Sequence, residues 1–239
     1  MQSEEIIENF DLALVACDKT IQSLRNMKIP EKDSRLSFYY KMRTLYNMFR
    51  ISYTFYQKYL LTKKFWKDNY PDFILSNKNM KKLYEEYDMF IRSNFITEVY
   101  STFESSLRVI IQNIEPDYYE KNITRFSKMA KKILTDFKLS EENQLIIHFS
   151  ILRNSMHSNG IFNPPDAENK IIEYKGKKFT YEVGKPVQYA GWTDLLSISK
   201  LIHYLFFDIC NHMLAKKISF IKEPASDFWN MLDSLLPNS

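Results

Sequence analysis

The sequence predicts an all-α fold, a helical bundle that carries one small β-hairpin. The chain has 239 residues with Gly 4, so tight turns are few, and this favours long helices over a many-stranded β fold. Hydrophobic residues make up 45% of the chain, which is enough for a sizeable core. Along most of the sequence they recur at the spacing of an amphipathic helix, and no internal repeat or low-complexity tract interrupts the pattern.

The N-terminal part of the chain contains two predicted helices. In residues 3–28, apolar side chains recur at helical spacing. Pro30 fits the start of a second, longer helix that runs to about Lys64, because proline is favoured in the first turn of a helix. Residues 65–78 are rich in turn-forming residues, so we expect them to connect this helix to the next one.

Two further helices are predicted in the central part. A long and strongly patterned helix spans about residues 79–114, and Pro116 starts another that continues to about Phe137. We expect residues 1–75 to form an N-terminal helical hairpin packed on a bundle of residues 76–239, or the whole chain to form one single domain.

The C-terminal part changes in character. Near residues 170–188, β-branched and aromatic residues alternate on both sides of Gly176, which predicts a β-hairpin. It is inserted before a final long helix over about residues 192–221, and Pro224 starts a short last helix. The hairpin could cover a site, contribute to a dimer or fill a gap, and the sequence leaves these roles open.

The most informative stretch closes the helix that precedes the hairpin. This helix opens at Ser140, a residue type that caps helix N-termini, and stops before Gly160, which readily adopts the left-handed backbone that ends a helix. Arg153 and His157 lie four residues apart and therefore project from one face, with Asn154 beside them. Arginine binds phosphate through a planar fork, and histidine can transfer a proton near neutral pH. The three side chains are thus a candidate phosphate-handling group.

A structural explanation of the same side chains stays open. Arginine and histidine in the last turn of a helix can bond to the free carbonyl groups there, and they suit the negative end of the helix dipole. In that case Arg153 and His157 would end a core helix, and the function would lie elsewhere.

The run Arg-Asn-Ser-Met-His-Ser-Asn-Gly, residues 153–160, resembles the signature at the end of the third helix in HEPN-type domains. The resemblance covers this motif and the general helical layout. It implies an HEPN-like helical bundle, two-fold dimers and, in many members, metal-independent cleavage of RNA. Some members are nucleases of toxin–antitoxin or phage-defence systems, and others are binding or assembly modules. In the common family pattern the arginine and the histidine are further apart, whereas only Asn154, Ser155 and Met156 separate them here.

Two functions follow as expectations. In the first, a metal-independent endoribonuclease without a cofactor, Arg153 holds the scissile phosphate, His157 acts as general base or acid, and Asn154 orients the imidazole or donates to a phosphate oxygen. In the second, the same group binds nucleotide or RNA, or stabilises a dimer, without cleavage. The short spacing favours the second function, and the presence of both reactive side chains favours the first. The partners implied by the resemblance are a second copy of the chain, RNA and a cognate antitoxin.

Two further groups of residues are expected to support this site. Glu104 lies beside the core face of the long central helix, where it either pairs with Arg108 four residues on or packs near Arg153 and fixes its guanidinium. The helix before the motif carries the most basic surface of the chain, which is either a solvated face or a rim that guides RNA. Its basic side chains include Arg125, Lys128, Lys131 and Lys132.

Charge and residue spacing argue against several other classes. The net charge of +4 permits an RNA partner without requiring one, and no glycine-rich phosphate loop or zinc-protease helix is present in the sequence. The spacing of Cys17, Cys210 and the four histidines gives no ligand pattern, so we expect no metal and two reduced thiols in a cytoplasmic protein. The acidic N-terminus does not resemble a signal peptide, and the longest apolar run is too short for a bilayer, so no membrane partner is expected.

Overall fold

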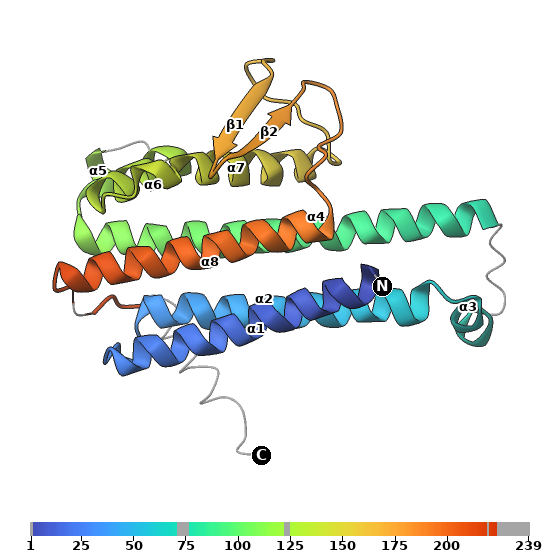
Figure 1. Cartoon of the computed structure of the whole chain (residues 1–239), viewed down its shortest axis with the longest axis horizontal. Helices are drawn as coiled ribbons and strands as arrows, with labels where there is room; N and C mark the ends of the chain where they lie inside the picture. Colours follow the sequence, from blue (N-terminus) through green and yellow to red (C-terminus); the bar gives the residue numbers. More distant parts are fainter. Residues whose placement is uncertain (1, 71–76, 122–124, 219, 224–239) are drawn as a thin grey trace.

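The computed structural model describes residues 2–70, 77–121, 125–218 and 220–223, and it places the helices in three layers (Figure 1). The first layer holds α1 and α2, the second α4 and α8, and the third α6 and α7 with the β-hairpin above them. The bounds are α1 Gln2–Asn26, α2 Ser34–Phe55, α3 Lys63–Asn69, α4 Asn77–Ile114, α5 Tyr118–Lys121, α6 Phe126–Asp136, α7 Asn143–His157, β1 Lys170–Tyr174, β2 Lys177–Tyr181 and α8 Trp192–Ala215. The prediction of an all-α fold with one small hairpin is confirmed.

The second predicted helix is interrupted in the structure. The α-helix α2 ends at Phe55, a π-helical turn follows over Tyr56–Leu60, and α3 then starts anew. Thr62 causes the break, since its backbone is extended and its side chain caps α3 by accepting from the Phe65 amide at 3.4 Å. The start also differs from the expectation at Pro30, because the Asp33 carboxylate caps α2 instead.

The predicted helix between Pro116 and Phe137 is found as two pieces, α5 and α6. Arg125, just before α6, has an extended backbone with φ −71° and ψ 127°, which no helix continues through. Residues 122–124 lie outside the described part of the chain. The long helix expected over residues 79–114 is confirmed as α4.

One hydrophobic core runs through all three layers. Its aromatic centre lies between α2, α4 and α8, where the Phe38 and Phe206 rings stack at 3.9 Å and Phe103 packs edge-on against both. Further up, Phe149 of α7 reaches Phe103 at 6.4 Å, so the motif helix is part of the same core. Cys17 and Cys210 are both free and buried.

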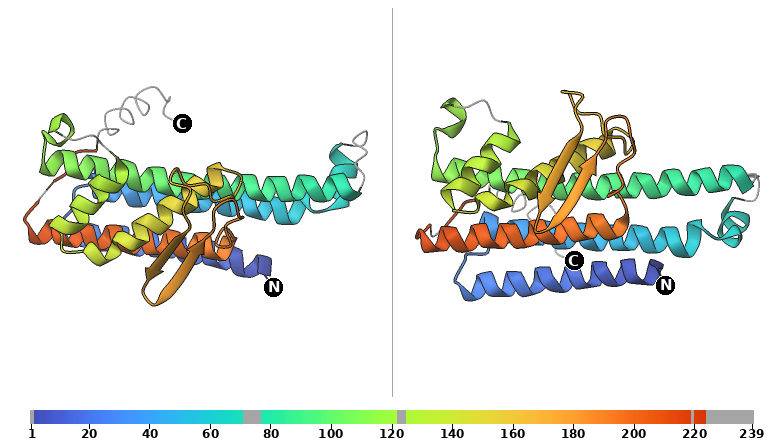
Figure 2. Two further views of the ribbon diagram at one scale, coloured as in Figure 1. Left: turned by 90° about the horizontal axis from the view of Figure 1, so that it is seen from above. Right: turned by 45° about the horizontal axis from the view of Figure 1, so that its top comes forward.

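The predicted hairpin is confirmed, and it lies on α7 (Figure 2). Its strands are antiparallel, with Tyr174 opposite Lys177, so Lys175 and Gly176 form a two-residue turn. Both turn residues have positive φ, 47° and 75°, as a type I′ turn requires. The buried face of the hairpin carries Ile172, Tyr174 and Tyr181.

The final helix is shorter than predicted. It ends at Ala215, because Lys217 adopts a left-handed backbone and the Ile218 amide donates back to the Met213 carbonyl at 3.1 Å. The chain then returns to the first layer, where the Ile221 amide donates to the Asp33 carboxylate at 3.0 Å. The short helix expected from Pro224 lies outside the described residues.

Candidate functional site

Different local structures precede the motif helix α7 and end it. A 3-10 turn, Ser140–Glu142, precedes it, so the α-helix begins three residues later than the Ser140 start predicted. At the other end Gly160 has φ 77° and its amide donates to the Ser155 carbonyl at 2.8 Å, as expected for a glycine stop. A Cβ at Gly160 would also approach the Met89 Cε to 3.3 Å, so α4 and the end of α7 are in close contact.

Arg153 is held against an aromatic ring of α4. Its Cζ lies 5.2 Å from the centre of the Tyr100 ring, within the range of a cation–π interaction. Its Nε is covered by protein and makes no hydrogen bond within the described residues. Its Nη1 donates to the Asn154 side-chain oxygen at 3.0 Å. Among the described side chains no carboxylate pairs with Arg153, so donors of its fork remain for a ligand.

Tyr100 is itself fixed by its surroundings. Its ring packs between Phe126 and Phe149, with centroid distances of 5.0 and 5.1 Å, and its hydroxyl lies 3.4 Å from the Ser150 Oγ. Burial is the largest cause that raises the pKa of Tyr100, so the hydroxyl stays neutral at physiological pH. The ring therefore offers Arg153 a rigid, uncharged support.

His157 and Asn154 are both exposed at the surface next to Arg153. His157 follows Arg153 by four residues on the last turn of α7, so both side chains lie on one face. In the part of the chain that the structure describes, the His157 imidazole has no hydrogen-bond partner. The arginine, amide and imidazole predicted as a group thus come from one stretch of exposed helix.

Glu104 pairs with Arg108. The Arg108 Nε donates to the Glu104 Oε1 at 3.0 Å, which is the first of the two arrangements expected from the sequence. Glu104 and Arg153 both act on the Tyr100 hydroxyl, since the carboxylate raises its pKa and the guanidinium lowers it. The structure therefore brings Glu104 to the same ring as Arg153, without a bond between the two side chains.

The basic face of α6 is partly neutralised. Lys132 is paired with Glu115 at 3.2 Å and Asp136 at 3.0 Å, so its charge is shared with two carboxylates. The side chains of Arg125, Lys128 and Lys131 are exposed. The N-terminal end of α6 is the end nearest the motif, because Phe126 packs on the Tyr100 ring.

The loop after the motif is tied to the segment after the hairpin. The Val187 amide donates to the Gly160 carbonyl at 2.8 Å, and the Phe162 amide donates to the Lys185 carbonyl at 3.0 Å. Nearby, Asp88 of α4 accepts from both the Trp192 indole at 2.9 Å and Arg92 at 2.8 Å, which anchors the start of α8. These contacts hold the loop after α7 on the segment after the hairpin, and the start of α8 on α4.

Sequence reasoning missed Tyr100, the residue that positions Arg153. In the sequence of α4, Tyr100 is only one more aromatic residue of the core face. It is far from α7 in the chain, so no residue spacing could connect it to Arg153. The hydrogen bond from the Ser93 hydroxyl to the Met156 carbonyl, at 3.4 Å, was missed for the same reason.

Within the group on α7, Asn154 and His157 are exposed and Arg153 is half-buried. Neither the cavity between α1 and α8 nor the one beside the hairpin contains Arg153 or His157. Over the described ranges, no cluster of three histidine, cysteine or acidic residues could hold a metal ion, and none of the helices is long and apolar enough for a membrane crossing. No protein-family model, no curated protein and no solved structure matches the chain.

Proposed function

We propose that the chain is a metal-independent endoribonuclease of the HEPN-like type, with Arg153 and His157 acting on an RNA phosphodiester. One observation carries the proposal. Arg153 is held on Tyr100, without a carboxylate partner among the described residues, one helical turn from the exposed imidazole of His157. Asn154 and His157 are exposed beside Arg153, so a polymer backbone can reach the group from solvent.

These two residues have different roles in the proposed reaction. The guanidinium of Arg153 holds the scissile phosphate and offsets the charge that develops on it. The imidazole of His157 accepts the proton of the ribose 2′-hydroxyl as its oxygen attacks phosphorus. The bond from phosphorus to the 5′-oxygen breaks, and that oxygen takes a proton. The products are a 2′,3′-cyclic phosphate and a 5′-hydroxyl.

A single imidazole must serve both proton transfers in one chain. In a two-fold dimer, His157 could act as the base while His157 of the partner subunit acts as the acid. The exposed part of the basic face, Arg125, Lys128 and Lys131, would guide the RNA backbone toward Arg153. In a toxin or phage-defence setting, a cognate antitoxin would cover the same surface.

The test is cleavage of a labelled, mixed-sequence RNA in EDTA by the parent protein and by His157→Ala and Arg153→Ala. We expect cleavage by the parent and a loss of about 10²-fold or more in His157→Ala, which is typical for a missing general base or acid. His212→Ala on α8 and Arg43→Ala on α2 are the matched controls and should cleave like the parent. Equal rates for parent and His157→Ala would refute the proposal.

A non-catalytic RNA-binding module is the second candidate. The short spacing favours it, since only three residues separate Arg153 from His157. In the same assay, this function predicts intact RNA that remains bound to the protein. Binding would then weaken in Arg153→Ala and stay unchanged in Arg43→Ala.

A further inference from the structure

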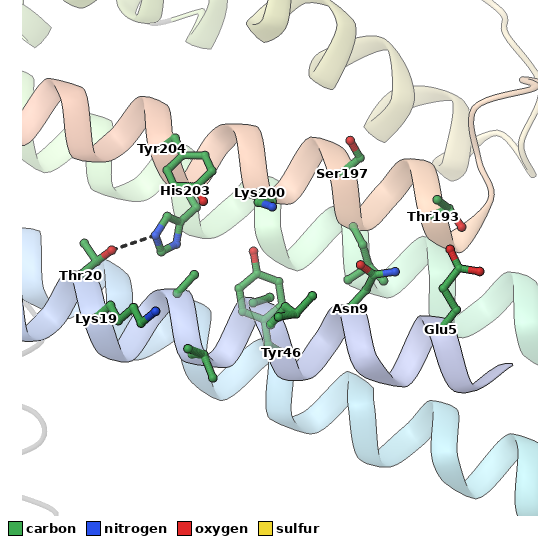
Figure 3. A pocket seen from close by; sticks show the side chains of 15 residues that line it. Glu5, Asn9, Lys19, Thr20, Tyr46, Thr193, Ser197, Lys200, His203 and Tyr204 are labelled. Carbon is green, nitrogen blue, oxygen red and sulfur yellow. Dashed lines mark hydrogen bonds between the residues drawn. The ribbon is translucent and has the colours of Figure 1, made fainter. Parts of the chain in front are cut away.

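A second site lies on the opposite part of the molecule, between α1 and α8, and it is independent of the ribonuclease proposal. Here the two helices run side by side over a cavity of about 580 Å³, with Tyr46 of α2 at its base (Figure 3). The side chains that face each other are small, with Ala13 and Ala16 on α1 and Ser197 on α8, so the helices leave space between them. This volume is in the range of small-molecule sites.

Part of this groove is lined by apolar side chains that are open to solvent. Leu12 and Val15 line it although they are 58% and 48% exposed, and Leu196 closes the wall on the α8 side. Exposed apolar side chains along a groove are typical of a ligand-binding surface, because they make only weak interactions with the water that a ligand would displace. The apolar stretch from Leu12 to Ala16 ends about 5 Å short of Lys19 along the helix axis.

Two lysines of the groove have no ion-pair partner among the described residues. Lys19 of α1 lies towards the Thr20 end, and Lys200 of α8 lies near the middle, above Tyr46 (Figure 3). Two arginines on α1 and α2, in contrast, have ion-pair partners. Arg43 is paired with Asp18 at 2.7 Å, and Arg25 with Glu31 at 2.6 Å.

The polar groups beside the two lysines are neutral. Burial lowers the pKa of His203 to about 4, so its ring is uncharged at physiological pH. Its Nε2 lies 3.0 Å from the Thr20 Oγ1, and its Nδ1 lies 3.8 Å from the Cys17 Sγ. If Nε2 carries the ring proton and donates to Thr20, the Thr20 hydroxyl proton is available to an anion in the groove. Glu5 places a negative charge at the far end (Figure 3).

We propose that the α1–α8 groove binds an amphipathic molecule with one carboxylate on an elongated apolar body. The carboxylate lies between Lys19 and Lys200, and the body lies along Leu12, Ala16 and Leu196. Glu5 repels a second negative charge at the other end, which fixes the direction of the ligand and disfavours a dicarboxylate.

The test uses 8-anilino-1-naphthalenesulfonate, whose fluorescence reports binding, and its displacement by dodecanoate. We expect saturable binding of one probe molecule per chain, full displacement by dodecanoate, and a dissociation constant for dodecanoate at least about tenfold higher in Lys19→Glu/Lys200→Glu. Ser197→Phe, which fills the groove from an exposed position, should abolish binding. Lys178→Glu on β2 is the control for charge at a single position and should bind like the parent.

Two results would overturn the proposal. One is dodecanoate binding in Lys19→Glu/Lys200→Glu that equals the binding by the parent, with helical content checked by circular dichroism. The other is loss of probe on raising the protein concentration alone, which would assign the groove to a second copy of the chain. Dodecanol has the apolar body of the ligand without its carboxylate, so it should bind equally to the parent and to the double variant.

Discussion

The surroundings of Arg153 suit the ligand role that we propose for it. The Tyr100 ring supports the guanidinium from one side and Asn154 accepts from its Nη1, while no described carboxylate neutralises it. An ion pair would have held the side chain equally well, but it would compete with a phosphate for the same donors. Glu104 could have done so, and its pair with Arg108 keeps it from that role.

Replacing the ring should therefore weaken the action on RNA more than replacing its hydroxyl. Tyr100→Phe keeps the aromatic face and should retain RNA binding within about twofold of the parent. Tyr100→Leu removes the cation–π interaction, worth about 0.5–2 kcal/mol, and should weaken RNA binding about two- to thirtyfold. Filter binding at fixed salt measures both. Equal binding by the two variants would show that the ring does not position Arg153.

A buried ion pair at the start of α2 is the second important feature at this scale. Asp33 and Arg35 are both completely buried and bonded to each other at 2.6 Å. Arg35 also donates to the Ile218 carbonyl at 3.1 Å, and Asp33 accepts from the Ile221 amide. Together they join the end of the described chain to the first layer.

Asp33→Ala should destabilise the protein by about 3–5 kcal/mol, because the charge of Arg35 would be left buried without its partner. Urea unfolding followed by circular dichroism gives the free energy of unfolding. Asp18→Ala is the control, since it removes an exposed carboxylate from Arg43 and should cost less than about 1 kcal/mol. A loss of that small size in Asp33→Ala would contradict the structural role.

At the scale of helices and strands, the sequence predicted the features that depend on residues close together in the chain. Arg153 and His157 share a face because helical geometry fixes side chains four residues apart. The hairpin was predictable from Gly176 and the alternation around it. Helix ends were less predictable, since the apolar pattern continues past Thr62 and past Lys217 although the backbone breaks at both. Tyr100 could not be predicted as a site residue, because only packing of α7 on α4 brings it to Arg153.

Polar contacts hold the hairpin against the motif helix. The Tyr181 hydroxyl bonds to the His148 Nδ1, and the Tyr174 hydroxyl donates to Glu142 at the start of α7. The Phe179 ring lies 4.0 Å from the His148 ring. His148 is thus enclosed between α7 and the hairpin, and its burial lowers its pKa to about 4.

This buried histidine makes stability depend on pH. Because the pKa is about 4 in the folded state and near 6.5 when unfolded, the unfolded chain binds the extra proton between these values. The contribution is complete above pH 6.5 and is lost as pH falls to 4, by at most about 3 kcal/mol. Urea unfolding across this range should show a shallower decline in His148→Gln than in the parent. An identical slope would mean that His148 is not buried as a neutral ring.

For the whole molecule, three layers on one core separate the two surfaces that we propose for ligands. The Arg153 group lies on the third layer, and the groove between α1 and α8 lies where the first layer meets the second (Figure 1). Their separation means that substitutions in one should leave the other intact, as expected for distant sites without shared partners.

The proposed chemistry also makes a prediction about assembly. The motif supplies one imidazole per chain, His157, for two proton transfers, so we expect a two-fold dimer that brings two copies of the motif together. Sedimentation equilibrium at rising protein concentration should show twice the mass of the 28.7 kDa chain. A monomer at every concentration would contradict a composite site, although a site within one chain would still be open to the cleavage assay.

The ends of the RNA fragments test the central claim most directly. The parent protein should cut RNA in EDTA to fragments with a 2′,3′-cyclic phosphate and a 5′-hydroxyl, and it should leave DNA of the same sequence intact, because DNA lacks the attacking 2′-hydroxyl. Mass spectrometry of the fragments identifies both ends. Fragments that end in a 3′-hydroxyl and a 5′-phosphate, or cleavage of the DNA, would contradict the roles given to Arg153 and His157. RNA left whole and still bound would instead establish the binding module.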